Sequence, residues 1–171
     1  VTINGKLLSI LDIGTGFHPD LTGRENVFFN GTILGISKKE IQRSFPAIVE
    51  FSGIEKFIDE PVKYYSDGMY LRLAFSTIIH MNADILVFDE VMSVGDISFQ
   101  EKCLEKLVEL KNSDTTLIIV SHNLNQISQF CDKIALLENG SITAINDSYD
   151  IIRKYALDHE ADKRRSGKGI I

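Results

Sequence analysis

One short apolar segment constrains the fold of this chain more than any other part of its sequence. Residues 85–88 are four consecutive apolar residues, and they end abruptly in the carboxylates of Asp89 and Glu90. An unbroken apolar run of this length, bounded by polar residues, is typical of a strand buried on both faces of a parallel sheet. Because ligands of such sheets bind beyond the carboxyl ends of the strands, Asp89 and Glu90 are predicted to reach a functional site. The alternative is that both carboxylates simply meet water at the end of a strand.

The composition fits one globular domain with a sizeable core. The chain has 171 residues, of which 44% are apolar and 25% charged, as in ordinary soluble proteins. The net charge of −6 gives no indication of a nucleic-acid surface. Cys103 and Cys131 lie far apart in no CxxC pattern, which argues against a disulfide framework or a zinc site and fits a reducing cytosol. No apolar run reaches membrane-spanning length, and no signal peptide is visible.

The rest of the chain alternates between strand and helix patterns after a mainly helical first half. Expected strands are residues 7–13, 85–89, 116–120, 133–138 and 141–145, and expected helices are 22–34, 37–53, 69–81, 98–111, 124–130 and 147–158. Three helix starts carry a capping box: Thr22 with Glu25, Ser37 with Glu40, and Ser98 with Glu101. Pro46 is expected to interrupt the second helix or to begin it. The alternation predicts βαβ units and a parallel sheet.

A second functional candidate is the start of the helix at 69–81. Ser66 and Gly68 precede this helix, where unpaired backbone N–H groups suit an anion such as phosphate. The Ser66 hydroxyl adds a donor, and Gly68 lets a ligand approach the backbone closely. The alternative, that Ser66 or Asp67 is only an N-cap, describes a far commoner feature.

A third candidate is His122, which follows the apolar run 117–120. In a doubly wound sheet the carboxyl ends of the strands share one edge, so His122 could converge with Asp89 and Glu90. The alternative is a structural histidine, which is the more frequent role of a lone histidine after a strand.

The order of these features resembles the ATP-binding subunit of ABC transporters over about residues 7–157. Residues 66–69 match the signature motif, 85–90 match Walker B, 93–96 match the D-loop, and His122 matches the switch histidine. Residues 14–26, 65–75 and 89–96 resemble the subfamily that exports polysaccharides such as O-antigen, capsule or teichoic acid.

The resemblance implies an α/β fold of the P-loop NTPase type, with a mostly parallel, incomplete sheet, flanking helices and an inserted helical subdomain. The whole chain would be one ABC ATPase domain fragment. Residues 1–19 would hold a strand and the Q-loop region, 20–82 the helical subdomain, 83–158 the catalytic α/β part, and 159–171 a tail.

The resemblance also implies roles for the candidate residues. Asp89 would hold Mg²⁺, Glu90 would orient and deprotonate the attacking water, and His122 would contact the γ-phosphate. The signature residues Ser66, Asp67, Gly68 and Met69 would cover the ATP held by a second subunit. Asp96 of the D-loop would lie at the interface of that dimer.

The implied cofactors are ATP and Mg²⁺, and the implied partners are a second ATP-binding subunit in a homodimer and a membrane-spanning permease, with no nucleic acid. The subunit would hydrolyse ATP to power polysaccharide export. It would be cytoplasmic, held at the inner face of the membrane by the permease.

The sequence departs from the family in three places. No G-x-x-x-x-G-K-[ST] loop occurs, so we expect the amino-terminal Walker A segment to lie upstream and its strand to lie beside residues 85–89. The chain as given is then expected to be inactive alone. No glutamine of the Q-loop falls within residues 12–19, and Asp67 stands where glycine or serine is commoner.

Two other interpretations stay open at the level of sequence. One is a non-transport ABC ATPase that acts on DNA or the ribosome, which the acidic balance and the lack of long coiled coils disfavour. The other is an inactive truncated remnant.

Overall fold

The computed structural model describes residues 2–10, 16–89, 95–121, 123–138 and 140–147. The chain divides into two compact units, Val1–Val120 and Ser121–Ile171.

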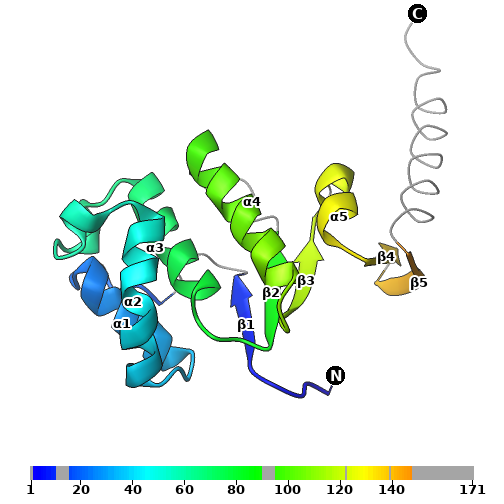
Figure 1. The fold of residues 1–171 in the computed structure, drawn as a ribbon, viewed down its shortest axis with the longest axis horizontal. Helices are drawn as coiled ribbons and strands as arrows, with labels where there is room; N and C mark the ends of the chain where they lie inside the picture. The colour runs from blue at the N-terminus through cyan, green and yellow to red at the C-terminus, as the bar shows by residue number, and fades with distance from the viewer. Residues whose placement is uncertain (1, 11–15, 90–94, 122, 139, 148–171) are drawn as a thin grey trace, which may run out of the picture. The chain divides into compact units, whose positions relative to one another are not determined.

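The first unit contains a parallel three-stranded sheet (Figure 1). Its strands are β1 (Leu7–Ile10), β2 (Ile85–Asp89) and β3 (Thr116–Val120), in the order β1-β2-β3. Leu86 of β2 lies opposite Leu8 and Leu117. The predicted parallel sheet is therefore confirmed, with the apolar run of residues 85–88 as its central strand.

The position of β2 corrects one prediction. A strand leading into a Walker A loop was expected beside β2, but β1 and β3 already pair with the backbone of β2 on its two sides. A further strand could pair only with the outer edge of β1 or β3. Burial of β2 is also uneven: Leu86 and Phe88 are buried, whereas Ile85 and Val87 on the alternate face are half-buried.

Three helices follow β1 and pack against one another. They are α1 (Gly23–Ile33), α2 (Lys38–Ser52) and α3 (Asp67–Ile79), with two short 3-10 turns, η1 (Glu55–Phe57) and η2 (Val62–Tyr64), before α3. The capping boxes predicted at Thr22 and Ser37 are both present, and Gly53 ends α2 in the left-handed conformation at φ 68°. Residues 73–79 of α3 are all buried, as expected for a helix that is apolar nearly all round.

Two helix predictions were wrong. Pro46 neither interrupts nor begins α2, which runs through it, because Ile41 and Ile48 are fully buried on either side and hold both halves against the core. This burial offsets a proline cost of about 3 kcal/mol. The third capping box is not formed, because α4 (Ile97–Lys111) begins before Ser98 and is capped by the Asp96 side chain.

An aromatic cluster joins α2, α3 and α4 of the first unit. Phe99 of α4 is 2% exposed, and its ring lies edge-on to Phe51 of α2 at 5.5 Å and to Phe75 of α3 at 6.1 Å. Helix α4 also contacts β3 (Figure 1). The helices and the sheet thereby share one core.

The second unit contains the short helix α5 (Leu124–Phe130) and a hairpin of β4 (Lys133–Glu138) and β5 (Ser141–Asp147). The hairpin is antiparallel and has a register shift between Leu136 and Leu137. The predicted strand pair around residues 139–140 is confirmed. The helix and tail predicted beyond residue 147 lie outside the described residues.

Candidate functional site

The first part of the candidate site is the start of α3. Ser66 is its N-cap, and the Ser66 hydroxyl oxygen accepts a hydrogen bond from the N–H of Met69 at 3.2 Å. The N–H of Tyr70 bonds to the Ser66 carbonyl, so the N–H groups of residues 67 and 68 precede the first bonds within the helix. Ser66 and Asp67 are exposed, whereas Gly68 and Met69 are half-buried. The predicted N-cap is real, and within the described part of the chain no residue accepts a hydrogen bond from the Ser66 hydroxyl.

Packing among the described residues does not require glycine at position 68. Among the described residues, a Cβ added at position 68 would have only the Ser66 hydroxyl oxygen nearby, at 3.9 Å. By contrast, a Cβ at Gly23 would lie 2.3 Å from the Tyr65 hydroxyl, and a Cβ at Gly31 would lie 2.7 Å from Ile41 Cδ1. Gly68 lies in a helix, where glycine costs about 0.5–1 kcal/mol relative to alanine. A missing side chain at this exposed helix start therefore suits a group that approaches from outside the chain.

Two polar side chains fix the segment that leads into α3 and the loop before α1, whose Leu21 carbonyl accepts a hydrogen bond from the N–H of Val62 in that segment. The Tyr65 hydroxyl donates to the Phe57 carbonyl at 2.6 Å, and burial raises the pKa of Tyr65 to about 12. Asn26 of α1 is fully buried, accepts a hydrogen bond from the N–H of His18 at 2.6 Å, and places its side-chain nitrogen 3.0 Å from the carbonyls of Leu21 and Thr22. Sequence reasoning missed both roles, although an asparagine within an otherwise core-facing helix is a usable signal.

The second part is Asp96, whose carboxylate serves two helices. One oxygen accepts a hydrogen bond from the N–H of Phe99 at 3.0 Å and so caps α4. The other oxygen forms an ion pair with the guanidinium of Arg72 on α3. The structure therefore connects Asp96 with the helix that begins at Ser66, a link that the sequence did not reveal.

The third part is the carboxyl end of β2. Asp89 is the last residue of that strand, and its backbone lies opposite Val120, the last residue of β3. Glu90 and His122, the two predicted catalytic residues, lie outside the described residues, as do residues 91–94. The predicted convergence of Asp89, Glu90 and His122 therefore stays a prediction.

A metal site built by several protein ligands is not present in the part of the chain that the structure describes. No group of three or more His, Cys, Asp or Glu side chains there could hold a metal ion. Mg²⁺ bound with a nucleotide needs only one or two carboxylates, since phosphate oxygens and water complete its shell. A single carboxylate at the end of β2 fits that donor set, whereas it would not fit a structural metal.

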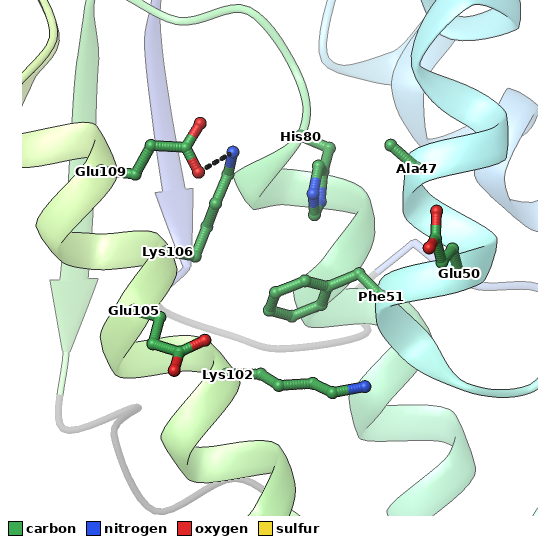
Figure 2. Close-up of a pocket in the computed structure, with 8 residues that line it drawn as sticks. All are labelled: Ala47, Glu50, Phe51, His80, Lys102, Glu105, Lys106 and Glu109. Carbon is green, nitrogen blue, oxygen red and sulfur yellow. Dashed lines mark hydrogen bonds and ion pairs between the residues drawn. The ribbon is translucent and has the colours of Figure 1, made fainter.

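A separate pocket of about 360 Å³ lies between α2, the end of α3 and α4 (Figure 2). Phe51 and His80 face one another there, with ring centroids 5.0 Å apart, and Lys106 pairs with Glu109 at 2.8 Å. Burial lowers the pKa of His80, whose Nδ1 lies 2.9 Å from the Ser76 carbonyl oxygen. None of the predicted site residues that the structure describes lines this pocket.

Within the described residues, no helix is long and apolar enough to cross a membrane. No family model matches the chain. It is 45% identical over 155 residues to the O-antigen export system ATP-binding protein RfbB of Klebsiella pneumoniae. The aligned region is 91% of this chain and 63% of that protein. It is 43% identical over 152 residues to the teichoic acids export ATP-binding protein TagH of Staphylococcus haemolyticus. This aligned region is 89% of this chain and 57% of that protein.

The fold matches a solved ATP-binding subunit of an ABC transporter. The TM-score is 0.76 at 21% identity, and the match covers 89% of this chain and 63% of that structure. The chain thus spans less than two thirds of the length of these relatives. The family resemblance read from the motifs is confirmed, because the homologues are ATP-binding proteins of polysaccharide export systems.

Proposed function

We propose that this homologue of the ATP-binding proteins of polysaccharide-export ABC transporters is part of an ATPase subunit that powers export of a polysaccharide through a membrane-spanning permease. The observation that carries the proposal is the start of α3, in a chain 45% identical to an O-antigen export protein. There, a serine cap is followed by a glycine at which a Cβ would meet only the Ser66 hydroxyl oxygen among the described residues, so this helix start has room for a ligand. This is the chemistry that an incoming phosphate needs.

Ser66 and Gly68 act on an ATP molecule held by a second copy of the subunit. The Ser66 hydroxyl can donate to a γ-phosphate oxygen while its oxygen still accepts from Met69. The positive end of the α3 dipole favours the same anion. Asp67 is exposed at the first position of α3, where a carboxylate favours the helix dipole and can turn toward solvent.

Asp89, Glu90 and His122 act on the nucleotide of their own subunit. Asp89, at the carboxyl end of β2, would hold Mg²⁺, which neutralises charge on the phosphates when ATP is bound. Glu90 follows Asp89 directly and would orient the attacking water and accept its proton. His122 would donate a hydrogen bond to the γ-phosphate as charge develops there.

The proposed assembly is a head-to-tail homodimer that docks on a permease. The packed helices of residues 20–82 would contact the permease, which would hold the dimer at the cytoplasmic face of the membrane. Asp96 would lie at the interface between the two subunits. ATP binding would close the dimer and hydrolysis would open it, which transmits work to the permease.

The test is phosphate release by the full-length protein with Mg-ATP, compared with two variants. Glu90→Gln should bind ATP but lose hydrolysis, because the amide keeps the shape of the side chain and cannot accept a proton. Glu109→Gln is the matched control, since Glu109 is an exposed partner of Lys106 on α4 and should keep turnover. Cells that carry only Glu90→Gln should also lose the exported surface polysaccharide.

Two outcomes would count against the proposal. Wild-type protein that releases no phosphate would defeat the ATPase assignment. Near-normal turnover in Glu90→Gln would remove Glu90 from the catalytic role.

A further inference from the structure

One carboxylate links the start of α4 to Arg72 in the first half of α3, although the two lie 24 residues apart in the sequence. Asp96 caps α4 through one oxygen, which accepts from the Phe99 N–H at 3.0 Å. Its second oxygen pairs with Arg72 of α3. With both oxygens engaged, α4 cannot shift against α3 without the loss of one of the two contacts.

Arg72 is held on several sides. Its guanidinium carbon lies 5.2 Å from the centroid of the Phe99 ring, and Phe99 is buried between aromatic rings of α2 and α3. A Cβ at Gly53, which ends α2, would lie 3.8 Å from a guanidinium nitrogen of Arg72. The Arg72 side chain is only 26% exposed, whereas that of Asp96 is 62% exposed. The Arg72 side chain is thus held in place by its neighbours, whereas the Asp96 side chain is largely exposed to solvent.

The ion pair of Arg72 and Asp96 contributes little to the stability of the fold. An ion pair with one largely exposed partner contributes about 0–1 kcal/mol. A planar guanidinium that lies over a buried ring, however, is fixed in direction as well as in charge. The geometry therefore favours a role in orientation.

We propose that Arg72 is a positioning residue that couples the start of α3 to Asp96. Because of this link, the start of α3 and Asp96 would move together when they approach the nucleotide of the second subunit. Ser66 and Arg72 lie on the same helix, about 9 Å apart along its axis. A change in the direction of α3 that follows phosphate contact at Ser66 is passed to Asp96 through Arg72. The inference rests on the proposed function of Ser66 and Gly68.

The chain contains a matched control pair. Arg24 of α1 pairs with Asp59 through two bonds of 2.7 and 3.1 Å, and its guanidinium carbon lies 4.7 Å from the centroid of the Phe45 ring. It has the same chemistry, an arginine that lies over an aromatic ring and pairs with an exposed aspartate. It links α1 to the turn before Glu60 and does not involve the start of α3 or α4.

The experiment is a double-mutant cycle on ATP hydrolysis by the full-length dimer. The variants are Arg72→Gln, Asp96→Asn and the double variant, and Asn keeps the N-cap because it caps helices as well as Asp does. Each single variant should lower kcat about tenfold, with the double variant no worse than either, as expected for residues that act as a unit. The KM for ATP should stay unchanged, because neither residue touches the nucleotide of its own subunit. Arg24→Gln should keep kcat within about twofold.

The alternatives are distinguishable. Additive losses in the cycle, or unchanged kcat in Arg72→Gln, would overturn the coupling while wild-type hydrolysis keeps the proposed function. An equal fall of kcat in Arg24→Gln would show a general loss of stability and would also overturn it. If Arg72→Gln does not fold, Asp96→Asn alone decides, and an unchanged kcat in that variant would overturn the coupling. Wild-type protein without ATP hydrolysis would defeat the proposed function and this inference together.

Discussion

Substitution of Gly68 by alanine should raise stability and lower activity at the same time. The new Cβ would meet only the Ser66 hydroxyl oxygen at 3.9 Å, an ordinary van der Waals contact, so the described chain has room for it. Alanine in place of a helical glycine stabilises by up to about 1 kcal/mol. For a domain of this size, that corresponds to a rise in Tm of about 2–4 °C.

The activity should move in the opposite direction. If a phosphate approaches the backbone at Gly68, a methyl group in its path should lower kcat for ATP hydrolysis by at least about tenfold, or about 1.4 kcal/mol. Differential scanning calorimetry gives the Tm, and phosphate release by the full-length protein gives kcat.

Gly31→Ala is the matched control. Gly31 is also helical, but a Cβ there would lie 2.7 Å from Ile41 Cδ1 and 3.1 Å from Met81 Cε, within the packed core. Overpacking should lower stability by about 1–3 kcal/mol. A fall in stability for Gly68→Ala, or unchanged hydrolysis, would refute the reasoning that Gly68 serves an external ligand.

Two further predictions concern the scaffold. Asn26→Ala should destabilise the protein by about 2–3 kcal/mol in urea unfolding, because it removes a fully buried side chain whose hydrogen bonds hold the loop before α1, whereas Asn112→Ala at the end of α4 should change little. Equal effects of the two would contradict the role of Asn26. Burial lowers the pKa of His80 below 6.5, so the unfolded chain binds the proton more readily and stability should fall as pH drops below about 6.5. His80→Gln should reduce that pH dependence, and an unchanged slope would show that other groups cause it.

The strands were predictable because their signal is local. The apolar runs at 85–88 and 117–120 ended where the chain turned polar, and β2 and β3 end there too. Asn139-Gly140 indicated the hairpin in the same way, since two residues with turn chemistry separate two apolar strands. Two of the three capping boxes also formed as predicted.

The wrong or missing predictions have two causes. Either a second residue competed for the same role, or the partner residue lies far away in the sequence. Asp96 replaced Ser98 as the cap of α4, because a carboxylate two residues earlier already satisfied the Phe99 N–H. The neighbours of β2 depend on pairing between distant segments, which no local pattern encodes. The link between Arg72 and Asp96 spans 24 residues and is visible only once α3 and α4 are packed.

The central claim is that Ser66 acts on the nucleotide of the opposite subunit, whereas Glu90 acts on that of its own. The most direct test compares two mixed dimers of the full-length protein in single-turnover ATP hydrolysis. One dimer pairs a Ser66→Arg subunit with a Glu90→Gln subunit, and the other pairs a doubly substituted subunit with a wild-type one.

The account predicts that the first dimer keeps one intact site, built from the Glu90 of the first subunit and the Ser66 of the second, and hydrolyses ATP there. The second dimer should be inactive, because each of its sites contains one substituted residue. Hydrolysis by the second dimer with none by the first would place both residues on the same nucleotide and would contradict the account.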